Sequence, residues 1–195
     1  IEREDVEEIS KEIEKEIKFS NPNTSVVVAP TVGHRVTVRL RDSKPLSSEI
    51  SNTDPAYGRV DGMGIAKAVS DFMKIEKCIP LEQTENAIST ANLVNEFTEQ
   101  SLEIMKKNDV NKRRSQKNKK LLNSILLRDA GNKYPNVKPI NDLHSMKFSC
   151  IVDMPVEVGI SNILKMRAYN AGGLTDYEEK ASVAAQAMET ENAKY

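Results

Sequence analysis

The order of apolar and polar positions predicts one helix and two strands in the first 41 residues. In residues 5–19, apolar side chains recur every three or four positions among glutamates and lysines, which is typical of an amphipathic helix (Val6, Ile9, Ile13 and Ile17). The segment NPN that follows favours a turn. Strands are predicted at 25–30 and at 31–41. We expect the apolar side of the helix to lie against another part of the chain.

The predicted strand 31–41 has one largely apolar face and one cationic face. Because side chains alternate along a strand, one face would hold Val32, His34, Val36, Val38 and Leu40, and the other Arg35, Thr37, Arg39 and Arg41. Like charges on one face repel unless water or an anion screens them. The cationic face is therefore either solvated or directed at a negative partner. A histidine on the apolar side is more typical of a half-buried hydrogen-bonding residue than of a catalyst.

The central part of the chain alternates between loop-like and helical patterns. Residues 42–64 are rich in Ser, Pro, Gly, Asn and Asp and predict a long irregular loop. A long helix is predicted at 85–107, with one face formed by Ala87, Ala91, Val94, Phe97, Ser101 and Met105. The basic run 108–120 indicates a solvated segment or a surface for polyanions. Residues 121–131 predict a buried strand that ends at a glycine turn.

A change of pattern after the Pro-containing segment 132–142 indicates a second unit. It predicts a strand at 148–154, a helix that begins at Pro155 and stops at 170–173, and a last helix with a capping box of Thr175 and Glu178. About 50 residues of this kind are too few to bury a core alone. We expect one domain over residues 1–143 and part of another over 144–195.

Composition narrows the class of protein. The chain has 195 residues, 38% hydrophobic and 29% charged, with a formal net charge of −1. No apolar run is long enough to span a bilayer, and the net charge gives no general attraction to nucleic acid. Cys78 and Cys150 do not make a disulfide framework, which indicates a reducing cytoplasm. Both ends lie at helices and the first residue is not methionine, so we expect a piece of a longer protein.

Individual motifs give few chemical signals. Two histidines and two cysteines without H-x-x-x-H or C-x-x-C spacing make no closed metal site, and no G-x-S-x-G elbow occurs. The segment 58–67 lacks the spacing of a phosphate loop and is interpreted as a cluster of turns. Asp54 before a proline opens a turn or orients a hydroxyl or an arginine. Arg128 and Asp129 end a predicted strand, where binding groups and ordinary surface residues both occur.

Four motifs in order give a more specific signal. They are GHR (33–35), S-x-TDP (51–55), LLR-x-AG (126–131) and GGL-x-DY (172–177). Together they resemble the archaeal-type cofactor-independent phosphoglycerate mutases of the alkaline phosphatase superfamily. The resemblance implies an α+β cap domain, with a mixed or antiparallel sheet and helices on one face, followed by a partial α/β segment of a phosphatase-like domain. It also implies interconversion of 2- and 3-phosphoglycerate through a phosphoserine, in glycolysis and gluconeogenesis.

The same resemblance implies roles for particular residues. Arg35 and Arg128 would clamp the substrate, and Asp54 would bind its hydroxyl or act as a general base. His34 would contact the phosphate, Arg113 or Arg114 would add a third cation, and Lys147 would lie near the transferred phosphoryl group. Arginines suit this substrate because a guanidinium binds carboxylate and phosphate groups with two parallel hydrogen bonds.

Cofactors and partners follow from the resemblance too. It implies divalent metal ions (Mn, Zn, Mg or Co) whose ligands lie outside this chain, and no need for 2,3-bisphosphoglycerate. The partners would be phosphoglycerate and the remainder of the catalytic domain, without nucleic acid or membrane, and the oligomeric state stays open. Two positions depart from the family: Asp129 replaces a usual glycine, and Asn52 a common acidic residue. The alternative is a nucleic-acid-binding or interaction module that uses the basic run 112–120.

Overall fold

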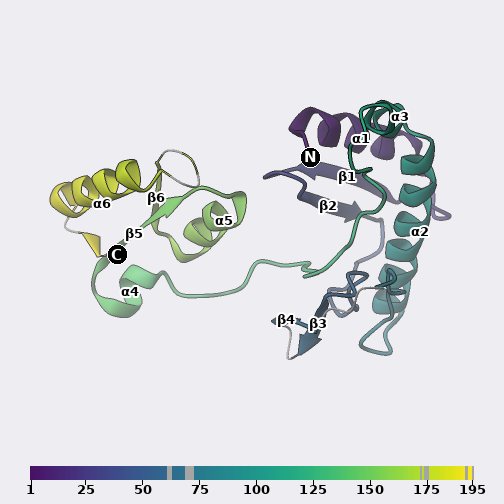
Figure 1. Ribbon diagram of the computed structural model, residues 1–195. Helices are drawn as coiled ribbons and strands as arrows, with labels where there is room; N and C mark the ends of the chain where they lie inside the picture. The colour runs from purple at the N-terminus through teal and green to yellow at the C-terminus, as the bar shows by residue number, and fades with distance from the viewer. Residues whose placement is uncertain (61–62, 69–72, 172, 174–175, 192, 195) are drawn as a thin grey trace. The chain divides into compact units, whose positions relative to one another are not determined.

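The computed structural model describes residues 1–60, 63–68, 73–171, 173, 176–191 and 193–194 (Figure 1). The chain forms two compact units, residues 1–132 and 133–195. The boundary predicted between residues 143 and 144 falls inside the second unit, within the short helix α4 (Ile140–His144). Each unit contains helices and small sheets, so the predicted α+β class is confirmed.

The first unit begins with a helix and an antiparallel strand pair. Helix α1 (Arg3–Glu16) is followed by β1 (Ser25–Pro30) and β2 (Val36–Arg41), with Val28 opposite Val38. The acidic residues in the first turn of α1 favour the helix because they face the positive end of its dipole. The helix and both strands therefore occur where the periodicity predicts them, although the second strand is shorter than expected.

A turn replaces the first five residues of the predicted strand 31–41. Gly33 has a φ of +60°, and the N–H of Arg35 donates to the carbonyl oxygen of Val32 at 3.1 Å. His34 and Arg35 thus precede β2, and both are exposed. The prediction of a half-buried His34 was wrong because the turn removes this residue from the sheet. Within β2 the predicted alternation holds, with the apolar residues half-buried and the others exposed.

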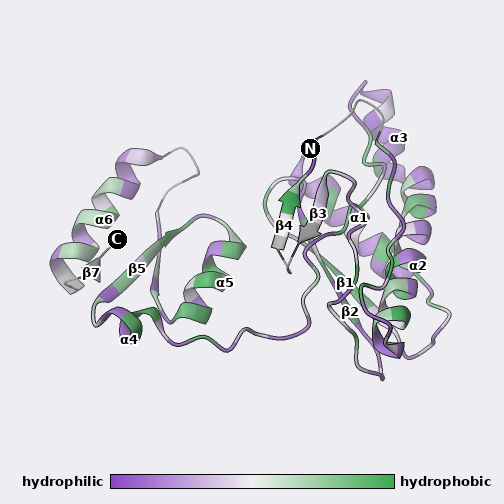
Figure 2. Ribbon diagram, turned by 90° about the horizontal axis from the view of Figure 1, so that it is seen from below, coloured by the Kyte–Doolittle hydropathy of each residue, from purple (hydrophilic) through white to green (hydrophobic). Residues whose placement is uncertain are grey.

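The core of the first unit lies between one face of the β1–β2 sheet, α1 and α2 (Glu85–Lys107). Its buried members are Ile9, Ile13, Ile17, Val28, Phe97 and Met105. Helix α2 begins where the Thr84 hydroxyl accepts a hydrogen bond from the Ala87 N–H at 3.2 Å. Both hydrophobic and hydrophilic residues occur along α2, as in an amphipathic helix (Figure 2). Burying each large side chain here contributes about 1.5–3 kcal/mol.

A hairpin lies within the segment predicted as an irregular loop. Strands β3 (Tyr57–Val60) and β4 (Met63–Ala66) pair antiparallel, with Tyr57 opposite Ala66. Residues 61 and 62 lie outside the described residues. The prediction of a wholly irregular loop was therefore wrong at this hairpin, which also contains the segment interpreted as a cluster of turns.

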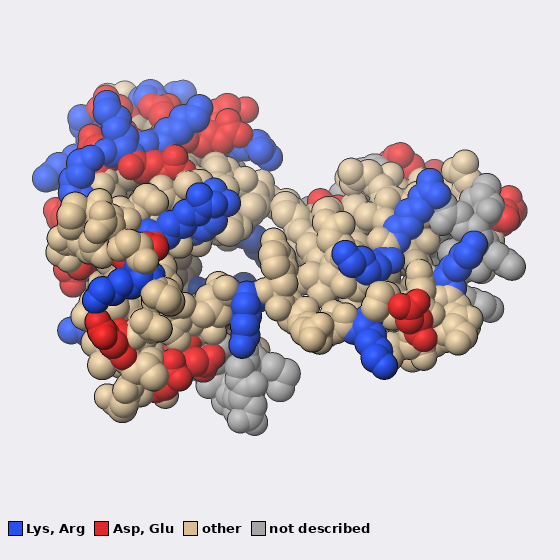
Figure 3. Space-filling model, turned by 180° about the vertical axis from the view of Figure 1, so that it is seen from behind, with Lys and Arg blue, Asp and Glu red and all other residues tan. Residues whose placement is uncertain are grey.

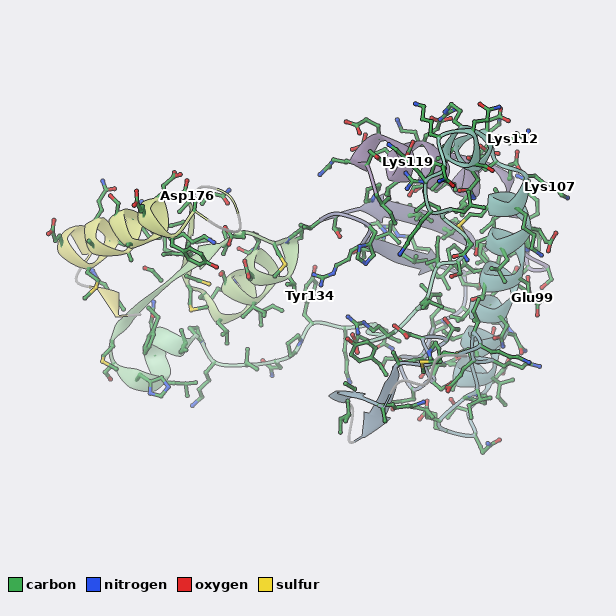
Figure 4. The ribbon with its side chains drawn as sticks, viewed as in Figure 1. Glu99, Lys107, Lys112, Lys119, Tyr134 and Asp176 are labelled. Atoms are coloured by element: carbon green, nitrogen blue, oxygen red, sulfur yellow. The ribbon has the colours of Figure 1, made fainter. Side chains whose placement is uncertain are left out.

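Most of the basic run 108–120 forms a helix. Helix α3 (Asp109–Gln116) begins where the Asn108 side chain accepts a hydrogen bond from the Val110 N–H at 2.7 Å. Acidic and basic side chains are interleaved over one end of this unit (Figure 3), and Lys112 and Lys119 mark the α3 region in Figure 4. Most of the run is exposed, as a solvated segment predicts; among its cations the exception is Arg114, which is buried and pairs with Asp5 of α1.

Residues 121–131 form no strand, although a buried strand was predicted. Leu122, Ile125 and Leu127 do pack against the core. At Leu122 the backbone pairs with a side chain instead: Asn111 donates to the Leu122 carbonyl oxygen at 2.7 Å and accepts from the Leu122 N–H at 2.9 Å. The prediction of burial therefore holds in part for these three residues, whereas Leu121 and Leu126 are exposed and the strand does not form.

The second unit has a parallel sheet of three strands in the order β6-β5-β7. Its elements are β5 (Lys147–Val152), α5 (Pro155–Leu164), β6 (Arg167–Asn170), α6 (Tyr177–Glu191) and β7 (Ala193–Lys194). Helix α5 packs on β5 and β6, while α6 packs on β5 and β7. Parallel strands joined by helices are typical of α/β proteins.

One predicted helix boundary in this unit was wrong. Helix α5 ends at Leu164, with Lys165 in a left-handed conformation, so that β6 occupies the segment predicted as the end of the helix. Thr175 lies outside the described residues. Asp176, labelled in Figure 4, accepts a hydrogen bond from the Glu179 N–H at 3.1 Å and so caps α6. No helix among the described residues is both long and apolar enough to cross a membrane.

Candidate functional site

Asp54 occupies a buried turn that leads into the β3–β4 hairpin. Its carboxylate accepts a hydrogen bond from the Ala56 N–H at 2.9 Å, and its backbone N–H donates to the Leu127 carbonyl oxygen at 3.2 Å. The first contact is the one expected for an Asp-Pro turn. The second ties Asp54 to a segment more than 70 residues away in sequence. Both the carboxylate and the backbone of Asp54 are therefore held by hydrogen bonds. The backbone bond goes to Leu127, which precedes Arg128 in sequence.

Arg128 lies against the hairpin. The central carbon of its guanidinium is 3.7 Å from the centre of the Tyr57 ring, which is a close cation–π contact. Its Nε atom is 3.5 Å from a carboxylate oxygen of Asp129. The Tyr57 side chain, and to a smaller extent the charges of Asp129 and Asp54, raise the pKa of Arg128. The side chain keeps 35% of its surface exposed, so it remains able to meet an anion.

Asn52 joins the pieces of this site. Its side-chain oxygen accepts a hydrogen bond from the Asp129 N–H at 3.3 Å, and its side-chain nitrogen donates to the Tyr57 carbonyl oxygen at 3.1 Å. A carboxylate at this position could accept the first bond but could not donate the second. The residue that departs from the family pattern is thus suited to the local structure.

Asp54, Arg128 and Tyr57 form the candidate site, and sequence reasoning identified the first two. Tyr57 was missed, although it lies three residues after Asp54 in the same motif region. An aromatic residue next to a candidate carboxylate was the available signal. Tyr57 matters here because its ring covers the face of the arginine.

His34 and Arg35 lie in another part of the first unit, the turn before β2, and both are exposed. Their proposed contacts with substrate stay predictions. The turn conformation at Gly33 presents both side chains outside the regular sheet.

Arg113 and Arg114 already hold carboxylates of α1. Arg113 pairs with Glu8 at 2.5 Å, and the guanidinium of Arg114 contacts both Glu2 and Asp5. Arg114 is 5% exposed and also donates to the Lys120 carbonyl oxygen at 2.7 Å. Either arginine would have to leave its partners to bind a substrate.

Lys147 begins β5 in the second unit and is exposed. This is the amino end of a parallel strand, whereas ligands of α/β proteins usually bind at the carboxyl ends. The residue after the carboxyl end of β5 is Asp153, which pairs with Lys180 of α6. Sequence reasoning did not single out this pair.

The described residues do not suit the metal ions that the resemblance implies. Among them, no three histidine, cysteine, aspartate or glutamate side chains come together in a way that could hold a metal ion. The described residues therefore offer no site for a metal ion that could take part in a chemical step.

Comparisons with known proteins agree with the resemblance. The sequence profile of a family described as 2,3-bisphosphoglycerate-independent phosphoglycerate mutase matches residues 1–111. A relative of that name from Aeropyrum pernix is 37% identical over 174 residues, which are 85% of this chain and 40% of the relative. Another from Pyrobaculum aerophilum is 32% identical over 169 residues, 87% of this chain and 37% of the relative.

A solved structure supports the fold. The cofactor-independent phosphoglycerate mutase from Thermoplasma acidophilum matches 97% of this chain and 46% of its own, with a TM-score of 0.55 and 24% identity. The chain spans about 40% of the length of the curated relatives named above. The profile match covers more than half of the chain and includes Asp54 and Tyr57. The chain therefore belongs to the family of 2,3-bisphosphoglycerate-independent phosphoglycerate mutases.

Proposed function

We propose that this chain is the substrate-binding part of a phosphoglycerate mutase that interconverts 2- and 3-phosphoglycerate. The observation that carries the proposal is the backbone hydrogen bond from Asp54 to Leu127, the residue before Arg128, because it brings together two motifs far apart in sequence. The names of the relatives support the choice of substrate. In this proposal Asp54 supplies the hydroxyl acceptor and Arg128 the anion donor that a phosphorylated hydroxy acid needs.

Arg128 binds an anionic end of the substrate in this proposal. Phosphoglycerate carries a carboxylate and a phosphate, and a guanidinium donates two parallel hydrogen bonds to either group. Because Arg128 is partly covered by Tyr57, its interaction with an anion is stronger than that of a fully solvated arginine. The resemblance implies that Arg35 is a second clamp and that His34 contacts the phosphate.

Asp54 acts on the free hydroxyl of the glycerate. Its carboxylate accepts the hydroxyl hydrogen bond and takes the proton as that oxygen attacks the phosphoryl group. The Ala56 N–H holds the carboxylate in place. A buried carboxylate held by the backbone needs little reorganisation during the reaction.

In this proposal the described residues have no role in the reaction beyond substrate binding and proton transfer. The phosphoserine and the metal ions that the family resemblance implies are not attributed to this chain. Contributions of Arg113, Arg114 and Lys147 remain predictions, as does the cytoplasmic location. We expect the 195-residue chain by itself to be inactive as a mutase.

The basic run gives little support to the alternative of nucleic-acid binding. Lys112 pairs with Asp109 and Lys119 with Glu2, while both arginines of the run pair with acidic residues of α1. These carboxylates reduce the positive charge that α3 presents to a polyanion.

A chimera tests the proposed function. Residues 1–195 would replace the matching stretch of the Aeropyrum pernix relative, and interconversion of the two phosphoglycerates would be measured. We expect an active chimera. Arg128→Ala should lower kcat about 100- to 1,000-fold, and Asp54→Asn by a similar factor, as for other positioned charged and acid–base groups.

Arg3→Ala is the matched control because Arg3 forms an exposed pair with Glu7 on α1. It should leave kcat within about twofold, since exposed pairs contribute little. Full activity of the Arg128→Ala and Asp54→Asn chimeras would remove both residues from the site and contradict the proposal.

A further inference from the structure

The backbone of Tyr57 is held by the loop that carries Asp54. The Tyr57 N–H donates to the Asp54 carbonyl oxygen at 3.3 Å, and its own carbonyl oxygen accepts from the Asn52 side chain at 3.1 Å. Pairing with Ala66 in the hairpin adds a further restraint. The backbone of Tyr57 is therefore held on both sides, and its ring offers a flat surface.

That surface meets the guanidinium of Arg128. The central guanidinium carbon lies 3.7 Å from the ring centre, while Asp129 lies 3.5 Å from the Nε atom. All five N–H groups of a guanidinium lie in its plane. Contact between the ring and the guanidinium face therefore restricts the side chain without consuming its hydrogen-bond donors.

We propose that Tyr57 is a positioning residue that holds the Arg128 guanidinium in place for the anionic group of phosphoglycerate. This inference rests on the proposed function. An unrestrained arginine loses considerable side-chain freedom when it binds an anion. Because Tyr57 restricts Arg128 beforehand, less freedom is lost on binding. The effect of Tyr57 passes through Arg128 and requires the aromatic ring.

Two substitutions separate the ring from the hydroxyl. Tyr57→Phe keeps the ring, and it should hold kcat/KM of the chimera within about threefold. Tyr57→Leu removes the ring, and it should lower kcat/KM about 3- to 30-fold, the range that corresponds to the usual strength of a cation–π contact. Tyr134→Leu is the matched control, because Tyr134 is 89% exposed and labelled in Figure 4; it should have no effect.

A double-mutant cycle tests whether Tyr57 acts through Arg128. In the Arg128→Ala background, Tyr57→Leu should cause no further loss of kcat/KM. A merely structural role would give additive losses and would overturn the inference. Unchanged activity of the Tyr57→Leu variant would overturn it as well.

A second measurement does not depend on activity. In the 195-residue chain, the Arg128 Nε–H signal is assigned as the ¹⁵N–¹H resonance that Arg128→Ala removes. Tyr57→Leu should shift this resonance, and Tyr57→Phe should shift it much less, because the ring lies against the guanidinium. No shift on loss of the ring would contradict the positioning role.

The two proposals fail differently. If Arg128→Ala leaves the chimera fully active, the proposed role of Arg128 in the reaction fails, whatever the resonance shows. If Arg128→Ala inactivates the chimera while Tyr57→Leu leaves both kcat/KM and the resonance unchanged, only the positioning role of Tyr57 fails.

Discussion

Thr53 and Leu127 exchange hydrogen bonds across 74 residues of sequence. The Thr53 N–H donates to the Leu127 carbonyl oxygen at 2.8 Å, and the Thr53 hydroxyl accepts from the Leu127 N–H at 2.8 Å. Asp54 follows the first residue and Arg128 the second. This exchange therefore brings the two candidate site residues into the same place.

Thr53→Val should destabilise the first unit. Thr53 is fully buried, and valine keeps its shape but leaves the Leu127 N–H without its acceptor. A buried donor without a partner costs about 1–3 kcal/mol of unfolding free energy. Urea unfolding of the 195-residue chain measures the change. Thr53→Ser keeps the hydroxyl and should lose clearly less stability than Thr53→Val; the reverse order would contradict the role of this bond.

The Asp129→Gly variant should be more stable than the Asp129→Ala variant. Asp129 has a φ of +59°, and its carboxylate lies so near Gly64 that a Cβ added there would come within 2.6 Å of an oxygen. Left-handed backbone is unfavourable for residues with a Cβ by about 1–2 kcal/mol, although aspartate tolerates it better than most. Asp129→Gly removes this strain and gives up only a partly exposed contact with Arg128.

Thermal unfolding compares the two variants. Asp129→Ala keeps the Cβ and loses the polar group, so its Tm should lie below those of the parent chain and of Asp129→Gly. A higher Tm for the alanine variant than for the glycine variant would show that the backbone conformation at residue 129 is not a source of strain.

The elements that the sequence predicts well are those held by local periodicity. The apolar spacing of Ile9 and Ile13 and the regular face of α2 require a helix whatever lies beyond them. The hairpin β3–β4 was missed because Gly58 and Gly64 lower its strand propensity. The apolar run 121–131 predicts a strand, because the run does not reveal that the partner of the Leu122 backbone is the side chain of Asn111.

In the candidate site, too, local motifs are visible in the sequence and long-range contacts are not. Asp54 and Arg128 were found through their motifs, since a short motif is visible in one sequence. Their proximity depends on contacts of Leu127 across long sequence separation, which no local pattern encodes. The pairing of Arg114 with α1 could not be foreseen for the same reason, because the charge run 112–120 does not show where its partners are.

Glu12→Gln should raise stability at pH 7 more than at pH 4. Burial, and then the negative charges of Glu16, Asp109 and Glu8, raise the pKa of Glu12. Because its folded-state pKa exceeds the unfolded value, its contribution favours folding below the unfolded pKa and is lost as pH rises through the folded pKa. At pH 7 the substitution removes this unfavourable charge, whereas at low pH the carboxyl is already protonated. Equal changes in Tm at the two pH values would contradict this assignment.

Arg114→Met should destabilise the first unit without abolishing substrate binding. Arg114 is 5% exposed and joins the start of α1 to the end of α3 through Glu2 and Asp5. Hydrogen bonds from Lys119 and Arg114 hold the pKa of Glu2 far below its usual range. Removing the Arg114 cation leaves Glu2 and Asp5 without the positive charge that they share. The partners keep solvent access, so we expect a loss of about 1–3 kcal/mol, below that for a fully buried pair.

Lys112→Met is the control for Arg114→Met, because Lys112 forms an exposed pair with Asp109 within the same helix. Its loss should change the unfolding free energy by less than about 0.5 kcal/mol. Urea unfolding gives both values, and KM of the corresponding chimeras shows whether either cation meets the substrate. If Arg114 serves to join α1 and α3, its variant loses stability while KM stays within about threefold. A large rise in KM with unchanged stability would instead assign Arg114 to the substrate, as the family resemblance implies, and would mean that it leaves Glu2 and Asp5 when phosphoglycerate binds.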